Sequence, residues 1–421
     1  SRLVFVTYCL LVSPGVARAQ TLEDALLYAI DAAAADEFGR AVSVAGDLAL
    51  VGAPHEDHSG LEDAGAAYLF QRMVNGSWIQ IQKLGASDGA EFDQFGSSVS
   101  LFGTRAVVGA PLDDDHGDGA GAAYVFERSL DAGWIEVQKL SPGGGLAGDA
   151  FGTSVSMFGE EIVLGAPGKD GNGSEAGAVY LYERHAVGGW FLETQFQPFF
   201  NGELDRYGIS VSFWGDRFAA GAWGADEDEF GPVGDFAGAV YISERNNGTW
   251  NLTNRIQASD RAAGAFFGYS VSLASDRVLV GAHGTGGNLA GAAYVFEARG
   301  SSYTTWEETA KLLPSDPDPA GDEFGKAVCL SPDRAWIGAA LDEDQGDASG
   351  SAYLFELDPG GGWSQVSELA TSNQAASDQL GAAAAFSGNR VLVGALAGDG
   401  SVPDSGATYV YDVGLGQTYC Q

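Results

Sequence analysis

The sequence predicts an all-β fold, a seven-bladed β-propeller of four-stranded antiparallel blades, and three observations predict it. Short markers recur seven times in a constant order along the 421 residues. Each repeat holds four short strand patterns that turn residues separate. The composition agrees, because Gly contributes 62 residues and aromatic residues 11%, whereas charged residues make up only 19%.

The first element along the chain has the layout of a secretory signal peptide. Arg2 is followed by an apolar run from Leu3 to Val12 and by a Ser13-Pro14-Gly15 break. The triplet Ala17-Arg18-Ala19 then supplies the small residues of a cleavage site. We expect residues 1–19 to be removed during export, and the mature protein to be secreted or held at the cell surface.

The body of the chain, residues 20–413, is expected to form the propeller as one domain. It contains no run of 18 or more apolar residues, so the sequence predicts no transmembrane segment in the mature chain. Residues 414–421 are expected to form a C-terminal tail. From the lone Cys420 in that tail we expect a larger parent protein with further domains or a sorting signal.

Each repeat begins with an aromatic-Gly pair, and the seventh pair is a Leu-Gly variant. The pairs are Phe38-Gly39, Phe95-Gly96, Phe151-Gly152, Tyr207-Gly208, Phe267-Gly268, Phe324-Gly325 and Leu380-Gly381. About fourteen residues later comes a Gly-Ala pair, which begins at Gly52, Gly109, Gly165, Gly221, Gly281, Gly338 and Gly394. A Tyr follows in every repeat. We expect the glycines to allow close approach of neighbouring backbones, and the aromatic side chains to fill the wedge between neighbouring sheets.

The second repeat illustrates the strands. Its first strand is expected at Ser97–Leu101, its second at Arg105–Gly109, its third at Ala122–Arg128 and its fourth at Trp134–Leu140. Tight turns or loops separate them, as antiparallel neighbours require. Four such strands repeated seven times are typical of propeller blades around a central channel.

The ring is expected to close through the N-terminal segment. The seventh repeat ends without a Trp-containing fourth strand of its own. In five of the other six repeats that strand ends eleven residues before the next aromatic-Gly pair, and eleven residues before Phe38 is Leu27, within Thr21–Tyr28. We therefore expect this segment to supply the outer strand of the last blade, although Glu23–Ala29 has helical propensity that packing must override.

With these markers, the chain resembles the FG-GAP repeat family, whose best-known members are the head propellers of integrin α-subunits. The resemblance implies the propeller fold and a role in binding or adhesion. Many integrin repeats carry an acidic calcium loop just before the Gly-Ala strand, but here that place holds minimal turns such as Phe102-Gly103-Thr104. Such turns have too few oxygen ligands for a hard cation. The family's usual calcium sites are therefore not carried over.

Acidic residues concentrate instead in the loops after Gly-Ala, where two repeats share an Asp-x-Asp pattern followed by Gly-Asp. Alternate Asp side chains in a turn can converge on Ca²⁺, which makes these residues the candidate calcium ligands: Asp113, Asp115, Asp118, Asp342, Asp344 and Asp347. The same residues also suit solvated turns. The Gly falls one position earlier than in an EF-hand loop and no bidentate Glu follows, which favours the solvated turns.

The net charge of the chain excludes some classes of binding partner. A formal net charge of −36 argues against nucleic acid and anionic membranes, which need cationic patches. No nucleophile-elbow signature or unique carboxylate pair occurs. We therefore expect a binding or adhesion module, not an enzyme, that presents one propeller face to an extracellular protein or glycan. Calcium bound at the acidic loops would assist this contact. The alternative is a propeller enzyme that acts on extracellular polysaccharide through its acidic-face carboxylates.

Overall fold

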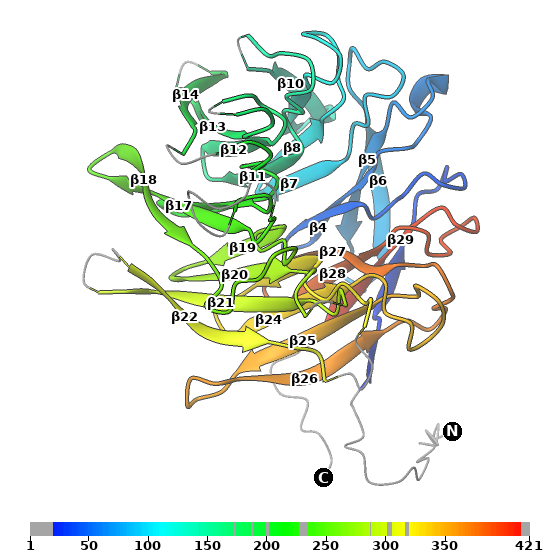
Figure 1. Ribbon diagram of the computed structural model, residues 1–421. Helices are drawn as coiled ribbons and strands as arrows, with labels where there is room; N and C mark the ends of the chain where they lie inside the picture. Colours follow the sequence, from blue (N-terminus) through cyan, green and yellow to red (C-terminus); the bar gives the residue numbers. More distant parts are fainter. Residues whose placement is uncertain are drawn as a thin grey trace, which may run out of the picture.

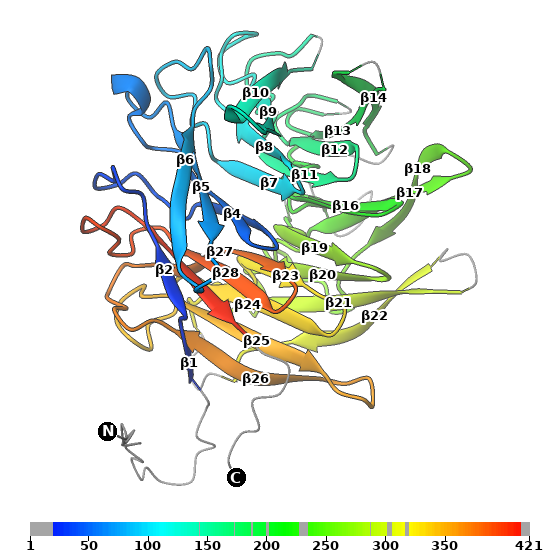
Figure 2. The same cartoon turned by 180° about the vertical axis from the view of Figure 1, so that it is seen from behind.

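The computed structural model describes residues 20–142, 144–171, 173–186, 188–198, 202–226, 235–286, 288–300, 305–315 and 320–413. Seven sheets lie around a central axis, which confirms the predicted seven-bladed propeller (Figures 1 and 2). The expected signal peptide, residues 1–19, and the expected tail, residues 414–421, lie outside the described residues. Within the described part, no helix has the length and apolar character needed to cross a membrane.

The blades are numbered in chain order, and their strands run from the axis outward. Blades one to three consist of β3 (Ala41–Ala45), β4 (Leu48–Ala53), β5 (Ala66–Arg72) and β6 (Trp78–Leu84); β7 (Ser98–Phe102), β8 (Arg105–Ala110), β9 (Ala122–Ser129) and β10 (Gly133–Leu140); and β11 (Ser154–Phe158), β12 (Glu161–Ala166), β13 (Ala178–Arg184) and β14 (Trp190–Phe196). In blade two, every strand boundary lies within one residue of the expected one.

Blades four to six repeat this order. They consist of β15 (Val211–Trp214), β16 (Arg217–Ala222), β17 (Ala239–Asn246) and β18 (Thr249–Ile256); β19 (Ser270–Ala274), β20 (Arg277–Ala282), β21 (Ala292–Arg299) and β22 (Thr305–Leu312); and β23 (Ala327–Leu330), β24 (Arg334–Ala339), β25 (Ser351–Leu357) and β26 (Trp363–Ala370). Blade seven has three strands from its own repeat: β27 (Leu380–Ser387), β28 (Arg390–Ala395) and β29 (Ala407–Asp412).

The N-terminal segment completes the ring as the sequence predicts. Strand β2 (Ala25–Leu27) pairs antiparallel with β29, and Leu27 lies opposite Thr408. Leu27 is 2% exposed, so packing overrides the helical propensity of this segment. A second contact was not predicted: β1 (Gln20–Leu22) pairs parallel with β26 as a fifth strand of blade six (Figure 2).

The glycines of the Gly-Ala pairs lie where neighbouring blades touch. A Cβ added at Gly109 would lie 2.0 Å from the carbonyl oxygen of Gly152, in the aromatic-Gly pair of the next blade. At Gly165 the corresponding distance to the Gly208 oxygen is 1.8 Å. The expected close approach is confirmed, and it joins the second strand of one blade to the start of the next.

The apolar core lies between blades. One cluster joins Leu50 and Leu69 of blade one to Val108 and Tyr124 of blade two. Phe95 is fully buried there, and its ring packs edge-on against Tyr124 at 5.5 Å between centroids. Equivalent edge-on or tilted pairs recur in other blades. Each sheet therefore buries its faces only against its neighbours, as in other repeat architectures.

An Asp that the repeat markers did not include lies two residues before six of the seven aromatic-Gly pairs. Its members are at most 4% exposed: Asp36, Asp93, Asp149, Asp205, Asp322 and Asp378. The Ala90 amide donates a hydrogen bond of 2.7 Å to Asp93 Oδ2, which fixes the turn before the blade. Burial raises the pKa of Asp93 to about 6, although the bond from Ala90 opposes the shift.

Candidate functional site

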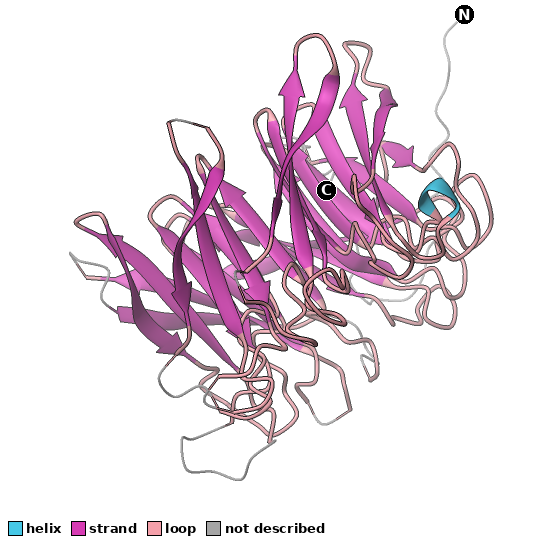
Figure 3. Cartoon of the chain, turned by 90° about the horizontal axis from the view of Figure 1, so that it is seen from above, coloured by secondary structure: helices cyan, strands magenta, loops and turns pink. Residues whose placement is uncertain are grey.

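The longer loops gather at one end of the blades, here called the loop face. They connect second to third strands and each fourth strand to the next blade, and they include the short 3₁₀ turn η1 (His58–Gly60). Figure 3 shows these loops along one side of the molecule, with the hairpin turns on the other. The predicted acidic loops all belong to the loop face.

In blade two, a lysine lies among the candidate calcium ligands. Lys139 Nζ is 2.8 Å from Asp113 Oδ2, 2.6 Å from Asp115 Oδ2 and 2.9 Å from Asp88 Oδ2. The buried Asp113 also accepts a hydrogen bond of 2.7 Å from the Tyr124 hydroxyl. Burial alone would lower the pKa of Lys139, but the bonds to these carboxylates raise it above its usual value. A calcium ion at Asp113 and Asp115 would have to displace this ammonium group.

Asp118, the third candidate in this loop, is exposed. Its backbone carbonyl accepts a hydrogen bond of 2.9 Å from the Gly148 amide. Within the described residues its side chain makes no hydrogen bond or ion pair with the Lys139 network. The structure therefore brings two of the three blade-two candidates together.

Blade six has the same loop with a different neighbour. Asp342 is fully buried and accepts hydrogen bonds from the Tyr353 hydroxyl and, at 2.9 Å, from the Asp344 amide. Asp347 is exposed, and its carbonyl accepts a bond from a backbone amide of the next blade. Glu368 lies opposite Tyr353, in the register position that Lys139 has opposite Tyr124 in blade two. The position of Lys139 in blade two is thus occupied in blade six by Glu368, which is buried.

Calcium binding remains a prediction for both loops. Among the described residues, no group of three or more His, Cys, Asp or Glu side chains is arranged to hold a metal ion. The two loops differ in the charge of one neighbouring side chain. Any test of calcium binding must therefore treat them separately.

The central channel supplies a second candidate site. The innermost strands of all seven blades line a cavity of about 230 Å³ that is open to solvent. At its loop-face mouth stands the residue that follows each aromatic-Gly pair. Unlike the scaffold markers, this residue differs in every blade: Arg40, Ser97, Thr153, Ile209, Tyr269, Lys326 and Ala382.

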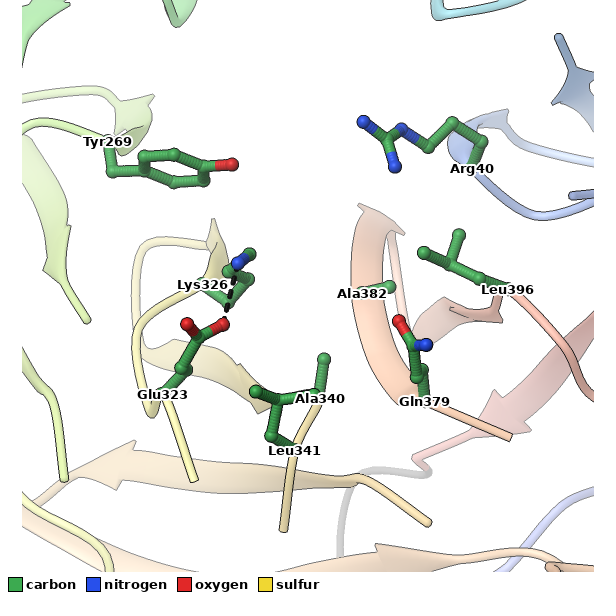
Figure 4. A pocket seen from close by; sticks show the side chains of 9 residues that line it. All are labelled: Arg40, Tyr269, Glu323, Lys326, Ala340, Leu341, Gln379, Ala382 and Leu396. Atoms are coloured by element: carbon green, nitrogen blue, oxygen red, sulfur yellow. Dashed lines mark hydrogen bonds and ion pairs between the residues drawn. The ribbon is translucent and has the colours of Figure 1, made fainter. Parts of the chain in front are cut away.

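Two of these residues, Arg40 and Lys326, are cations in a strongly acidic chain. They line a pocket of about 140 Å³ at the channel mouth, here called the mouth pocket. Figure 4 shows the Arg40 guanidinium and the Tyr269 hydroxyl pointing toward each other from opposite sides of this pocket. Lys326 lies beside Tyr269, with Nζ 2.6 Å from Glu323 Oε2 and 5.4 Å from the Tyr269 ring centroid. The remaining lining side chains are Ala340, Leu341, Gln379, Ala382 and Leu396.

An aromatic cluster extends from this pocket over blades five and four. Tyr269 contacts His283 with ring centroids 4.4 Å apart, and His283 stacks on Phe266 at 5.1 Å. Phe266 in turn packs edge-on against Trp223 at 5.3 Å. Burial, with a smaller effect of the Lys326 charge, lowers the pKa of His283 to about 4, so it is neutral at pH 7. Its Nδ1 is buried and has no hydrogen-bond partner among the described residues.

The sequence contained a signal for this site that was missed. Trp223 and His283 occupy the third position of Gly-Ala-x, where three other repeats have Pro. Arg40, Tyr269 and Lys326 occupy the position after the aromatic-Gly pair, where the repeats disagree. A search for positions that break the repeat, as well as those that keep it, would have found both sets.

Comparison with known protein families supports the architecture. The FG-GAP repeat matches residues 22–70, 78–126, 134–182, 250–296, 306–355 and 363–411, more than half of the chain. The matches omit residues 183–249, where β15, β16 and β17 nevertheless form a blade with the same strand order. A comparison with curated proteins gives no match. On its repeats and its fold, the chain belongs to the FG-GAP repeat family.

Proposed function

We propose that this protein is an extracellular binding module that presents its loop face to a protein or glycan, with the mouth pocket as the centre of contact. One observation carries the proposal. The positions that hold the blades together repeat around the ring, whereas the residues at the channel mouth differ in every blade. A repeated scaffold has no need of such differences, but a site for one asymmetric ligand does.

The chemistry of the mouth pocket suits ligand binding. It combines two cations, a tyrosine hydroxyl and an amide with apolar side chains, which is typical of concave ligand sites. In the adjoining aromatic cluster, Trp223, Phe266 and Tyr269 are partly exposed next to it, whereas His283 is buried between Phe266 and Tyr269. The signal-peptide layout of residues 1–19 supports export, and the resemblance to integrin propellers supports a role in adhesion.

Binding to arrays of extracellular matrix proteins and glycans tests the proposal. We expect the purified full chain to bind at least one array member, and the Trp223→Ala variant to lose most of this binding. Trp214→Ala is the matched control, because Trp214 lies at a hairpin turn of blade four, at the end of the blade opposite the loop face, and is 45% exposed.

Two results would overturn the proposal. One is the absence of binding to any array member by folded protein. The other is equal loss of binding in the two tryptophan variants, which would place the contact elsewhere. Turnover of any polysaccharide by the purified protein would favour the enzyme alternative.

A further inference from the structure

We propose that the mouth pocket binds an acidic sugar, one sugar ring that carries a single carboxylate, with Arg40 and Lys326 contacting the carboxylate. The inference deepens the proposed function, on which it rests, by naming the ligand class for the same site. It follows from the charges, the size and the hydrogen-bonding groups of the pocket.

The two cations retain donors for a ligand. The Arg40 side chain is 50% exposed, and among the described residues its one ion pair is a long contact of 3.5 Å to Glu37. Lys326 donates to Glu323, and an ammonium group has three donors. An arginine can hold both oxygens of a planar carboxylate at once, which a compact ammonium cannot. We therefore assign Arg40 as the main carboxylate contact and Lys326 as the supporting charge.

The size of the pocket limits the ligand to about one ring. A cavity of roughly 150 Å³ holds benzene, a six-membered ring without substituents, and the mouth pocket measures about 140 Å³, so one sugar ring would fill it and leave some of its substituents outside. The lining side chains Ala340, Leu341, Ala382 and Leu396 offer an apolar surface to the ring face. A longer ligand would have to continue out of the pocket, over the aromatic cluster that begins at Tyr269.

The polar groups around the pocket favour a ligand with hydroxyl groups. Glu37 and Glu323 flank the two cations, and Gln379 and Tyr269 complete the polar lining. Carboxylates accept hydrogen bonds and cannot donate them, so they suit sugar hydroxyls. The same glutamates, in a chain with a net charge of −36, repel a second negative charge on the ligand. A single carboxylate on a polyhydroxylated ring satisfies both conditions.

Ligand-observed NMR titrations of the full chain with D-glucuronic acid test the inference. Glucose is the matched neutral probe, because it differs only in having a hydroxymethyl group in place of the carboxylate, and acetate is the matched anion without a ring. We expect saturable binding of glucuronate, and binding of glucose and acetate at least about tenfold weaker, as expected for loss of a charge-assisted hydrogen bond. Competition among the probes should show one shared site.

The variants Arg40→Gln and Lys326→Gln locate the site. We expect Arg40→Gln to weaken glucuronate binding about tenfold or more, and Lys326→Gln to weaken it less. Arg299→Gln is the control for net charge, because Arg299 is 49% exposed and ion-paired to a glutamate, but lies at the end of β21, away from the channel. Melting temperatures of the three variants equal to that of the wild type would show that each remains folded.

Several results would overturn the inference. These are no saturable binding of glucuronate, equal binding of acetate or glucose, tighter binding of an N-acetyl amino acid than of glucuronate, or no effect of Arg40→Gln. Array binding that depends on Trp223 but not on Arg40 would remove the acidic-sugar inference and leave the proposed function standing. If Trp223→Ala and Arg40→Gln both bind the arrays as the wild type does, the acidic-sugar inference and the proposed function are both wrong.

Discussion

Replacing the buried Asp93 by asparagine is expected to stabilise the protein at neutral pH. Asp93 is 3% exposed, and the hydrogen bond from the Ala90 amide is its described contact. An asparagine carbonyl can accept the same bond without the cost of burying a charge. Burial raises the pKa of Asp93 from 3.8 to about 6, so at pH 7 the folded protein holds a carboxylate whose charged form its surroundings disfavour.

The size and the sign of the effect follow from this shift. A change of about two pKa units corresponds to about 3 kcal/mol, so we expect Asp93→Asn to raise the free energy of unfolding by about 1–3 kcal/mol at pH 7. Because the folded carboxyl binds its proton more tightly than the unfolded one, this group favours folding most below pH 3.8. Its contribution falls as the pH rises through about 6. The advantage of the asparagine should therefore shrink between pH 7 and pH 5 and vanish near pH 4.

Urea unfolding at pH 7, 5 and 4 measures this difference directly. Asp88→Asn is the matched control from the same loop. Burial would raise the pKa of Asp88, but hydrogen bonds from Lys139 and Tyr124 lower it, so this substitution should destabilise the protein at pH 7. A loss of stability in Asp93→Asn at pH 7, or a constant difference from wild type at all three pH values, would refute the reasoning.

Three further predictions concern the scaffold and the metal. Gly109→Ala should lower the free energy of unfolding by about 3 kcal/mol or more, because the new Cβ would lie 2.0 Å from a carbonyl oxygen of the next blade, whereas Gly360→Ala, with nothing within 4 Å, should be nearly neutral. Similar urea midpoints for the two variants would contradict the blade contact. Leu27→Ala should cost about 2–5 kcal/mol because the side chain is 2% exposed, and Ile30→Ala, 74% exposed, should change stability by less than about 0.5 kcal/mol; equal melting temperatures would argue against ring closure by β2. Any rise of the melting temperature with calcium should come from blade six, because a lysine ammonium occupies the space among the blade-two carboxylates, and Asp342→Asn should remove that rise. Identical wild-type melting curves in calcium and in chelator would exclude the calcium prediction.

The repeat made most of the fold predictable from sequence. Because seven copies of one sheet must pack on one another, their common residues are fixed by the same contacts and stand out against the variable loops. The strands of blade two were therefore expected within one residue. The spacing of Leu27 from Phe38 predicted the outer strand of blade seven, against the local helical propensity. The pairing of β1 with β26 involves three residues and leaves no marker in the sequence, so it was missed.

The candidate sites were less predictable, because they depend on residues that are distant in sequence. Lys139 approaches Asp113 and Asp115 from the fourth strand of the blade, and nothing in the acidic loop itself indicates an ammonium at its centre. Arg40 and Lys326 come from blades one and six, and only the closure of the ring places them around one pocket. A periodic pattern identifies what the repeats share, and the proposed site consists of what they do not share.

The pairing of β2 with β29 has a consequence for the order of folding. These strands are separated by almost the entire ring in sequence, yet Ala25 lies opposite Val410, and the Asp24 amide donates a bond of 2.8 Å to the Val410 carbonyl. During synthesis from the N-terminus, β2 therefore stays unpaired until β29, the last strand of the chain, has been synthesised. We therefore expect the pairing of β2 with β29, which closes a loop of almost the whole chain, to be the last and slowest step of folding. Before that step, the two end sheets of the unclosed ring would expose their edges and apolar faces, so we expect the nascent chain to be most prone to aggregation during that interval.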